Sequence, residues 1–460
     1  MTEQFRDQGG AATMSPSVFQ RWALSRGTSY LFSEKQIEKR RRKAERRRMA
    51  SGESHVVEYF HQLDDGYSHL ACQLLSKFAK RYDIELRCHL VRGPEGNNVA
   101  DADLLLRLSR YDAGLIASAY GAYFPESSEP PSSASVERAT AILAAVDASN
   151  LTAAIPEISA ALWNHDDEAL DEHEARWGRA SAEQARAALE KGTQRRATLK
   201  HYSGAMFYYG GEWYWGLDRL HYLEDRLSLL GADLSVGDPK VAPCPIIDTT
   251  GITDASALTL EFYPSLRSPY TSIIFDKTVE VASQMGVSFE MRPVLPMVMR
   301  GVPATREKGM YIFFDTAREG RRQGVPYGNF YDPIGDPVRR AYSIYPWAVS
   351  QGRGTELLSS FLRHAFFLGI STNSDRGLRR VVEAAGLDWR TAQQHLGSSD
   401  WEALVEENRL RMYEAGIWGV PSYRLLDPEG NPLLEAWGQD RLWLVVKTIK
   451  DHFRDTSSKA

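Results

Sequence analysis

Cysteine is scarce in this chain of 460 residues, which contains only Cys72, Cys88 and Cys244. No two of them form a C-x-x-C motif or stand at a spacing typical of a zinc site. A disulfide scaffold and a zinc ribbon are therefore excluded, and any redox chemistry would depend on single thiols. We expect each thiol to be a small buried residue rather than a nucleophile.

Long apolar runs are also absent, and none of those present could span a bilayer. The first 26 residues mix Glu3, Arg6 and Asp7 with glycine and serine, without the apolar segment of a secretory signal. Charged residues make up 25% of the chain and apolar residues 43%, as in ordinary globular proteins. The sequence predicts a cytoplasmic protein without a membrane partner.

An excess of positive charge is missing as well, because the formal net charge is −5. No overall field attracts nucleic acid, so we do not expect it as a partner. One segment differs, with basic runs at residues 39–43 and 46–48. Such runs can contact phosphates, but Glu34, Glu38 and Glu45 are interleaved at helical spacing, which favours a solvated helix face. Contact with a partner through this basic helix stays open.

The length of the chain predicts two to four domains, and the pattern of elements favours two. Residues 1–53 are expected to form a basic helical extension, and residues 54–232 a first domain. A linker rich in proline, glycine, aspartate and threonine follows at residues 233–256, before a second domain at residues 257–456.

Both predicted domains show one order of elements: strand, helix, strand, long helical stretch, strand pair, helix. In the first domain these elements are expected at residues 56–60, 67–82, 84–91, 99–200, 204–215 and 218–230. In the second they are expected at residues 258–263, 270–285, 287–293, 303–416, 422–436 and 440–453.

Short sequence matches at both ends of the domains indicate an internal repeat. Near the start, Glu58-Tyr59-Phe60 and Asp65-Gly66-Tyr67 match Glu261-Phe262-Tyr263 and Ser268-Pro269-Tyr270 without a gap. Near the end, Trp215-Gly216-Leu217-Asp218-Arg219-Leu220 matches Trp437-Gly438-Gln439-Asp440-Arg441-Leu442. We interpret this as duplication of one α/β domain.

The repeated order predicts a thioredoxin-like fold. A strand-helix-strand unit gives two parallel strands, and the later strand pair adds antiparallel ones. Gly419-Val420-Pro421-Ser422 lies where such a domain places a cis-proline, although the sequence alone does not reveal the isomer. Residues 427–431 contain the turn of the strand pair, and Asp218 and Asp440 are expected to cap the last helices. The predicted fold class is α/β, with two tandem thioredoxin-like domains that each carry a helical insertion.

The second repeat resembles the DsbA-like superfamily. It is most similar there to the branch of 2-hydroxychromene-2-carboxylate isomerase and kappa-class glutathione transferase. The resemblance covers most of residues 256–453 and, more weakly, residues 55–230. The motifs that carry it are Glu261-Phe262-Tyr263, Ser268-Pro269-Tyr270, Lys308 with Tyr311, Asp315 and Arg318, Gly324-Val325-Pro326, Trp418-Gly419-Val420-Pro421-Ser422, and the Trp437–Leu442 match.

This resemblance implies a glutathione-dependent isomerase or transferase that acts on a small conjugated or aromatic substrate. In that branch a serine replaces the first active-site cysteine, and Ser268 holds this position. Its hydroxyl at a helix start would donate to the thiolate of glutathione and lower the thiol pKa.

The other site residues are implied by the same resemblance. Val420, before Pro421, would pair with the glutathione backbone. Gln439 and Asp440 would receive the γ-glutamyl end, and Lys308 would lie near the glycyl carboxylate.

Departures from the branch leave alternatives open. Residues 300–304 lack an expected asparagine, and Arg267 precedes Ser268 where a smaller residue is common. In the first repeat Asp65 stands at the position of Ser268, and residues 203–206 lack the proline. That repeat is interpreted as structural or as a different binding site.

Two other functions stay in view: a DsbA-type thiol–disulfide oxidoreductase, which the missing C-x-x-C opposes, and a non-catalytic thioredoxin-like binding protein. The loop residues His61, Asp64, Asp65 and His69 lack further ligand spacing, so no metal is predicted.

Overall fold

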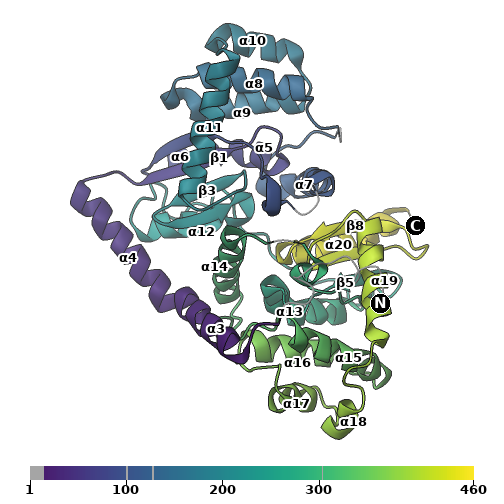
Figure 1. Ribbon diagram of the computed structural model, residues 1–460. Coiled ribbons are helices and arrows are strands. Elements are labelled where there is room, and N and C mark those ends of the chain that lie inside the picture. The colour runs from purple at the N-terminus through teal and green to yellow at the C-terminus, as the bar shows by residue number, and fades with distance from the viewer. Residues whose placement is uncertain (1–14, 100–101, 127–128, 303, 460) are drawn as a thin grey trace. The chain divides into compact units, whose positions relative to one another are not determined.

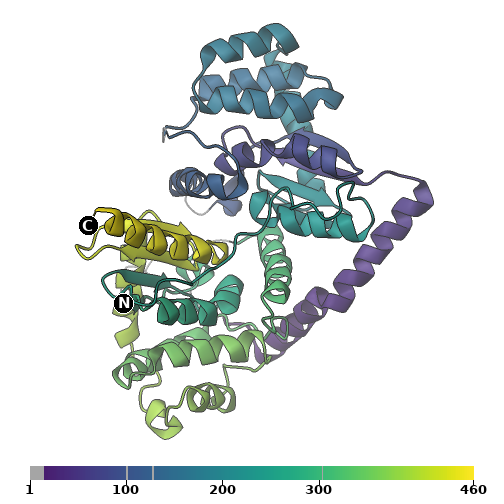
Figure 2. The ribbon, with the colours of Figure 1, turned by 180° about the vertical axis from the view of Figure 1, so that it is seen from behind.

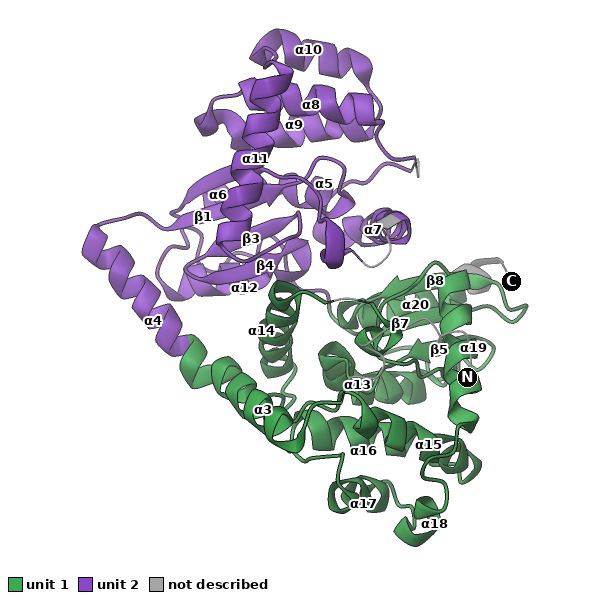
Figure 3. Ribbon diagram, in the orientation of Figure 1, with its two compact units in different colours: residues 1–37, 246–460 green, residues 38–245 purple. Residues whose placement is uncertain are grey.

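The computed structural model describes residues 15–99, 102–126, 129–302 and 304–459. The chain forms two compact units: unit 1 comprises residues 1–37 and 246–460, and unit 2 comprises residues 38–245 (Figure 3). Each unit has its own four-stranded sheet with helices packed against it, so the protein is of mixed α/β class.

The sheet of unit 2 has the order β2-β1-β3-β4 (Figure 1). Its strands are β1 (Val56–His61), β2 (Glu85–Leu90), β3 (Met206–Tyr209) and β4 (Glu212–Trp215). β1 and β2 are parallel, whereas β3 runs antiparallel to both β1 and β4. β1 is β-branched and aromatic and is buried over nearly its whole length, as expected for a central strand covered on both faces.

Helices connect and cover these strands. Along the chain, α5 (Gly66–Cys72) and α6 (Leu75–Arg81) connect β1 to β2. α12 (Gly216–Leu229) packs on β3, β4 and α5. The long stretch between β2 and β3 forms α7 (Ala102–Ile116), α8 (Ser133–Ala145), α9 (Leu151–Trp163), α10 (Asp167–Trp177) and α11 (Ala182–Thr198), with short 3-10 turns at Gly96–Asn98, Ala117–Tyr120 and Ala148–Asn150.

The single helix predicted at residues 67–82 is wrong, because the structure divides it into α5 and α6. At the break the carbonyl of His69 accepts a hydrogen bond from the side-chain amide of Gln73, at 3.1 Å. The same amide donates to the carbonyl of Tyr123, at 2.7 Å. In a continuous helix the backbone N–H of Gln73 would bind the His69 carbonyl, whereas here the Gln73 side chain binds it.

The sheet of unit 1 has the order β6-β5-β7-β8, with β5 (Thr259–Tyr263), β6 (Ser288–Met291), β7 (Ser422–Leu426) and β8 (Pro432–Trp437). β5 is parallel to β6, and β7 is antiparallel to β5 and β8. The strand order and directions are therefore those of unit 2.

The helices of unit 1 pack on this sheet and on one another. α13 (Pro269–Met285) contacts α14 (Arg306–Arg322) and α16 (Gly354–Phe366), and α20 (Leu442–Lys459) lies along β7 and β8 (Figure 2). The remaining elements are α15 (Asp336–Ser350), α17 (Asp375–Ala384), α18 (Trp389–Gln393) and α19 (Asp400–Glu414), with 3-10 turns at Met297–Arg300 and Gln439–Arg441.

The two sheets also share their register. Phe60 pairs with Met206 in unit 2, as Tyr263 pairs with Ser422 in unit 1. The next strand continues the correspondence, because Met206 pairs with Trp215 and Ser422 with Trp437. The internal sequence match aligns Phe60 with Tyr263 and Trp215 with Trp437, as this register does. Tandem duplication stays a prediction that this register supports.

Two polar pairs recur at matching places. The Tyr67 hydroxyl donates to Asp112 at 2.7 Å, and the Tyr270 hydroxyl donates to Asp315 at 2.8 Å, in each case across 45 residues. A buried glutamate on the central strand pairs with an arginine from the last helix before the hairpin: Glu58 with Arg195 in unit 2, and Glu261 with Arg411 in unit 1.

The described part of the predicted N-terminal extension consists of α3 (Val18–Phe32) and α4 (Glu34–Ser51), while residues 1–14 lie outside the described residues. α3 belongs to unit 1, where its buried Arg21 donates from Nη1 to the carbonyl oxygens of Asp332, at 2.6 Å, and Ile334, at 2.7 Å. The Phe32 ring packs on α14. This segment is thus an integral helix of unit 1.

The basic helix α4 has several of its charges paired. Arg41 binds Glu212 in unit 2 through two hydrogen bonds of 2.6 and 2.8 Å, and Arg48 binds Glu45 one turn away. The Arg48–Glu45 pair is one of the interleaved pairs that the sequence predicted, whereas Arg41 is held by a glutamate of β4.

The predicted capping roles of Asp218 and Asp440 are wrong. α12 begins at Gly216, directly after β4, so Asp218 lies in the first turn and accepts the hydroxyl of Tyr120 at 2.8 Å. Asp440 lies inside the 3-10 turn that precedes α20. In both cases a glycine with positive φ, Gly216 or Gly438, turns the chain straight from strand into helix.

All linker residues from 234 to 256 are described, and they contain no helix or strand. The first part of the linker is held to unit 2 by the buried carboxylate of Glu224, which accepts hydrogen bonds from the backbone N–H groups of Val241 and Ala242. Among the described residues no single helix is long and apolar enough to cross a membrane.

Candidate functional site

Ser268 lies where the sequence places it, at the start of the first helix of unit 1. It is the N-cap of α13, and its Oγ accepts the backbone N–H of Thr271 at 3.1 Å. Pro269 occupies the first helical position, where a proline costs no hydrogen bond. The half-buried hydroxyl therefore stands at the positive end of a helix of 17 residues.

The segment before β7 faces this hydroxyl. The Val420–Pro421 peptide bond is cis, and the Ser268 hydroxyl donates to the Val420 carbonyl at 3.4 Å. The Pro421 carbonyl accepts the Gly438 N–H at 3.0 Å, which ties this segment to the end of β8. Within the described part of the chain, no hydrogen bond engages the N–H of Val420.

Two tryptophans flank this segment. The ring centroids of Trp418 and Trp437 are 5.2 Å apart. Gly419 leaves room for the indole of Trp437, because a Cβ there would lie 2.1 Å from Nε1 of that ring. The Nζ of Lys308, from the first turn of α14, lies 5.6 Å from the centre of the Trp418 ring. Burial lowers the pKa of Lys308.

A second cation in this region was missed by sequence reasoning. Arg300 is 8% exposed and donates to the hydroxyl of Tyr413, at 3.3 Å, and to the carbonyl of Trp418, at 3.4 Å. Burial lowers the pKa of Arg300. The available signal was a charged residue in the segment 300–304, which sequence reasoning noted only for its missing asparagine.

Gln439 and Asp440 lie just beyond Gly438. The amide of Gln439 is buried, donates to Glu319 at 3.0 Å and accepts from Gln323 at 2.8 Å. Asp440 keeps 23% of its side chain exposed, with its Oδ1 3.5 Å from Nη1 of Arg441. The structure thus brings Ser268 into contact with Val420. Lys308 contacts Trp418, two residues before Val420, and the Gln439 amide is hydrogen-bonded to Glu319 and Gln323 of unit 1.

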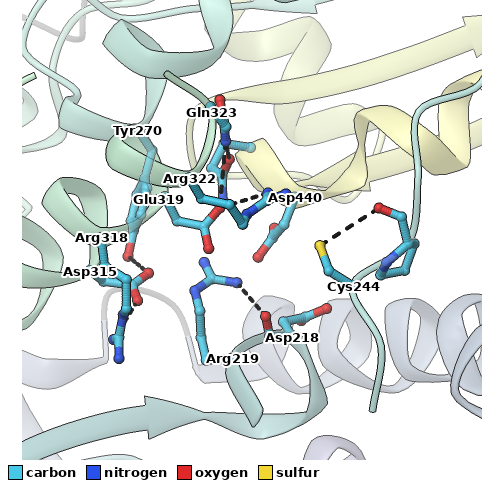
Figure 4. Close-up of polar contacts among 12 residues, drawn as sticks. Asp218, Arg219, Cys244, Tyr270, Asp315, Arg318, Glu319, Arg322, Gln323 and Asp440 are labelled. Atoms are coloured by element: carbon cyan, nitrogen blue, oxygen red, sulfur yellow. Dashed lines mark hydrogen bonds and ion pairs between the residues drawn. The ribbon is translucent and has the colours of Figure 1, made fainter. Parts of the chain in front are cut away.

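A buried polar cluster joins the first turn of α13 to α14. Figure 4 shows the Tyr270 phenol directed at the carboxylate of Asp315, with Glu319 further along α14 and Gln323 directly after its last residue. Asp315 is fully buried and also accepts a hydrogen bond from Arg318 at 2.8 Å. This cluster fixes α14 against the helix that carries Ser268.

Arg267, which precedes Ser268 where the similar family branch commonly has a smaller residue, donates two hydrogen bonds of 2.8 and 2.9 Å to Asp332. The N–H of Asp332 in turn donates to the Ser25 hydroxyl of α3, at 3.0 Å. The charge of Arg267 is therefore paired next to Ser268, and α3 helps to position its partner.

The corresponding place in unit 2 is built differently. Asp65 is the N-cap of α5 and accepts both the N–H and the hydroxyl of Ser68, at 2.9 and 2.7 Å. Ala205, in register with Pro421, donates its N–H to the Ser68 Oγ at 2.8 Å, a bond that a proline could not make. Burial raises the pKa of Asp65 to about 6.

The cysteines offer no thiol pair, because none of the three forms a disulfide in the described structure. Burial raises the pKa values of Cys72 and Cys88 to about 12, so both thiols are protonated near neutral pH. All three lie in unit 2, and unit 1 has no cysteine in its sequence. Among the described residues no group of three or more histidine, cysteine or acidic side chains is placed to hold a metal ion.

One parallel and two antiparallel strand pairs, a helix that starts at Ser268 and a cis-proline facing that start define a thioredoxin fold in unit 1. Residues 259–450 match the family model of the DSBA-like thioredoxin domain. This part of the chain is accordingly a DSBA-like thioredoxin domain, as the sequence resemblance predicted.

Solved structures similar to the chain include a 2-hydroxychromene-2-carboxylate isomerase, with 17% identity over 44% of this chain and 99% of that one, at a TM-score of 0.38. A probable DsbA oxidoreductase from Streptomyces coelicolor has 17% identity over 42% and 90%, at a TM-score of 0.34. A cytosolic disulfide reductase, DsbM from Pseudomonas aeruginosa, has 16% identity over 44% and 98%, at a TM-score of 0.28. No curated protein matches the chain.

Proposed function

We propose that unit 1 is a glutathione-dependent isomerase or transferase acting on a small conjugated or aromatic substrate, with Ser268 as the residue that stabilises a thiolate. The observation that carries this proposal is the Ser268 hydroxyl at the start of α13, 3.4 Å from the carbonyl before Pro421, in a unit without cysteine. Unit 1 supplies no thiol of its own at this place, so thiol–disulfide exchange by unit 1 itself is disfavoured.

The hydrogen bonds of Ser268 suit this role. Its Oγ accepts from Thr271, which fixes the oxygen, while its proton points along a contact of 3.4 Å to Val420. That contact is at the long end for a hydroxyl donor and therefore weak. A thiolate would offer a stronger, charge-assisted acceptor, and the positive end of α13 adds to the stabilisation.

The surrounding residues fit a peptide-like thiol that carries carboxylates. The Val420 N–H is available to pair with an extended backbone. Lys308 and Arg300 place two cations beside Trp418, where burial weakens their hydration. Glutathione would supply the thiolate that adds reversibly to a conjugated substrate.

Gln439 and Asp440 are the residues proposed for the γ-glutamyl end. The Gln439 amide is bonded to Glu319 and Gln323, so binding through this side chain requires an exchange of those bonds. Asp440, on the surface side of the turn, is the more direct partner for an ammonium group.

A calorimetric titration of the full chain with reduced glutathione tests the proposal. We expect saturable binding that Asp440→Ala weakens by about tenfold, the loss of one charge-assisted contact. Asp451→Ala, a half-exposed aspartate on α20, is the matched control and should bind like the wild type. Absence of binding to the wild type would overturn the proposal and favour a binding role without thiol chemistry.

A further inference from the structure

One face of α4 is formed by exposed basic side chains. Because each residue turns a helix by about 100°, residues three, four and seven apart share a face. Five basic residues of α4 fall in this way within about 140° of its circumference. They are all exposed, all belong to unit 2, and are called here the basic face: Lys39, Arg42, Lys43, Arg46 and Arg47.

The opposite side of α4 is held to unit 2. Arg41 binds the carboxylate of Glu212 in β4 through two hydrogen bonds. Arg48 is paired with Glu45, and both are half-buried, as is Ala44 between them and Arg41. These contacts fix the helix with its basic face turned to solvent.

The charges of the basic face are hardly compensated by the protein. In the described part of the chain, Arg42 is the member of the face that an acidic side chain approaches, with its Nη1 3.5 Å from Oε2 of Glu38. Both side chains of this pair are more than half exposed, so the pair is weak. Cations gathered on one exposed face repel one another and attract anions to it.

The length of the basic face suits the phosphate backbone of a nucleic-acid duplex. From Lys39 to Arg47 the helix rises about 12 Å, and a duplex carries about seven phosphates over that length of its axis. Each cation of the face can therefore meet a phosphate. A membrane is a poorer match, because stable attachment needs an apolar or lipid anchor besides basic residues. Between Glu38 and Arg48 the only apolar residue is Ala44, which lies on the opposite side of the helix.

We propose that the basic face of α4 binds the phosphate backbone of a nucleic-acid duplex. Backbone contacts carry no sequence information, so the binding is independent of base sequence. The formal net charge of the whole chain is −5, and the attraction is therefore local to this face. The proposal concerns residues of unit 2 and is independent of the site around Ser268.

Fluorescence anisotropy of a labelled DNA duplex of about 20 base pairs, titrated with the full chain, tests the proposal. We expect saturable binding whose logarithm falls with log salt at a slope of about −4, or about 250-fold in affinity between about 50 and 200 mM salt. Arg42→Gln/Arg46→Gln removes two of the five cations and should reduce this slope by about two. Absence of duplex binding at the lower salt, or an unchanged slope in this variant, overturns the proposal.

A matched control and a variant of opposite effect complete the test. Arg376→Gln/Arg380→Gln removes two exposed arginines with the same spacing from α17 and should bind the duplex like the wild type. Glu38→Gln releases Arg42 and should strengthen duplex binding, whereas weaker binding in this variant contradicts the proposal. Vesicles containing phosphatidylserine are the comparison surface, and binding of vesicles without binding of the duplex would overturn it.

Discussion

Matching positions in the two units carry side chains of opposite chemistry. Where unit 1 has Ser268, an uncharged donor at a helix start, unit 2 has the half-buried carboxylate of Asp65. Where unit 1 has Pro421, unit 2 has Ala205, whose N–H closes the site by bonding to Ser68. A carboxylate at this point would repel a thiolate, so the two units are expected to bind different molecules.

Asp65 leads to a prediction about pH. Burial raises its pKa from 3.8 to about 6 in the folded protein. Below about pH 4 both states are protonated, but between about pH 4 and 6 the unfolded chain loses the proton that the folded protein keeps, so the wild type loses stability as pH rises. Asparagine caps a helix as well as aspartate does. The free energy of unfolding of Asp65→Asn minus that of the wild type should therefore be about 1–3 kcal/mol larger at pH 7.5 than at pH 4.

Urea unfolding of both proteins at the two pH values measures this difference. Asp166→Asn, which makes the same change at the exposed N-cap of α10, is the matched control for replacing a cap carboxylate by an amide. A stability difference between Asp65→Asn and wild type that stays constant from pH 4 to 7.5 would contradict the burial argument.

The buried glutamate of unit 1 gives a second prediction. Glu261 has no solvent exposure, is bonded by Arg411, lies 3.4 Å from Arg292 and accepts the hydroxyl of Tyr263 at 2.8 Å. Glu261→Gln leaves these arginines without their anion, and we expect the free energy of unfolding to fall by about 3–5 kcal/mol. Denaturant unfolding measures it, with the exposed Glu280→Gln as control. A loss below about 1 kcal/mol would mean that water supplies the missing partner.

Among the elements, the strands and the start of α13 were the most predictable. β1 and β5 follow short apolar runs, and α13 starts at Ser268 because a serine before a proline is a strong helix-start signal. The errors occurred where side chains or glycines override the pattern. Gln73 binds the carbonyl at the break between α5 and α6, and Gly216 starts α12 two residues before the expected cap.

α3 is the element whose role the sequence concealed, because its partners are about 300 residues away along the chain. The Phe32 ring lies 4.4 Å from that of Phe314 and 5.3 Å from that of Phe313. We expect Phe32→Ala to destabilise unit 1 by about 3 kcal/mol, the cost of a large cavity between helices.

Hydrogen exchange measures this effect locally, and faster exchange is expected in residues 329–334, which α3 holds in place. Leu24→Ala, at a position 65% exposed on the same helix, should leave exchange unchanged. Equal exchange in Phe32→Ala and wild type would show that α3 does not stabilise unit 1.

At the scale of the whole molecule, the sequence predicted two α/β domains with one order of elements, and the described residues form two sheets with one strand order. Ser268, Val420 and Pro421 were recognised because they lie in short motifs of a known family. Arg300 and the Arg267–Asp332 pair were not, since their contacts join segments that are distant in sequence and depend on how the helices pack. Single-sequence patterns do not report such contacts.

The cysteines provide a test of how unit 2 is packed. Because Cys72 and Cys88 are held protonated, with pKa values of about 12, iodoacetamide should not modify them in the folded protein at pH 8. Mass spectrometry after native labelling measures this, and labelling in urea is the control in which both react. Native modification of Cys72 would contradict its burial and reopen thiol chemistry in unit 2.

The central claim is that Ser268 stabilises a bound thiolate, and the thiol pKa of bound glutathione measures it directly. A pH titration of the thiolate absorbance in wild type, Ser268→Ala and Ser374→Ala provides that pKa. Ser374 is also a helix N-cap of unit 1, so its variant controls for the loss of a cap. The account predicts a bound thiol pKa at least one unit below that of free glutathione in wild type and Ser374→Ala, and a return towards the free value in Ser268→Ala. The same bound thiol pKa in all three proteins would contradict it.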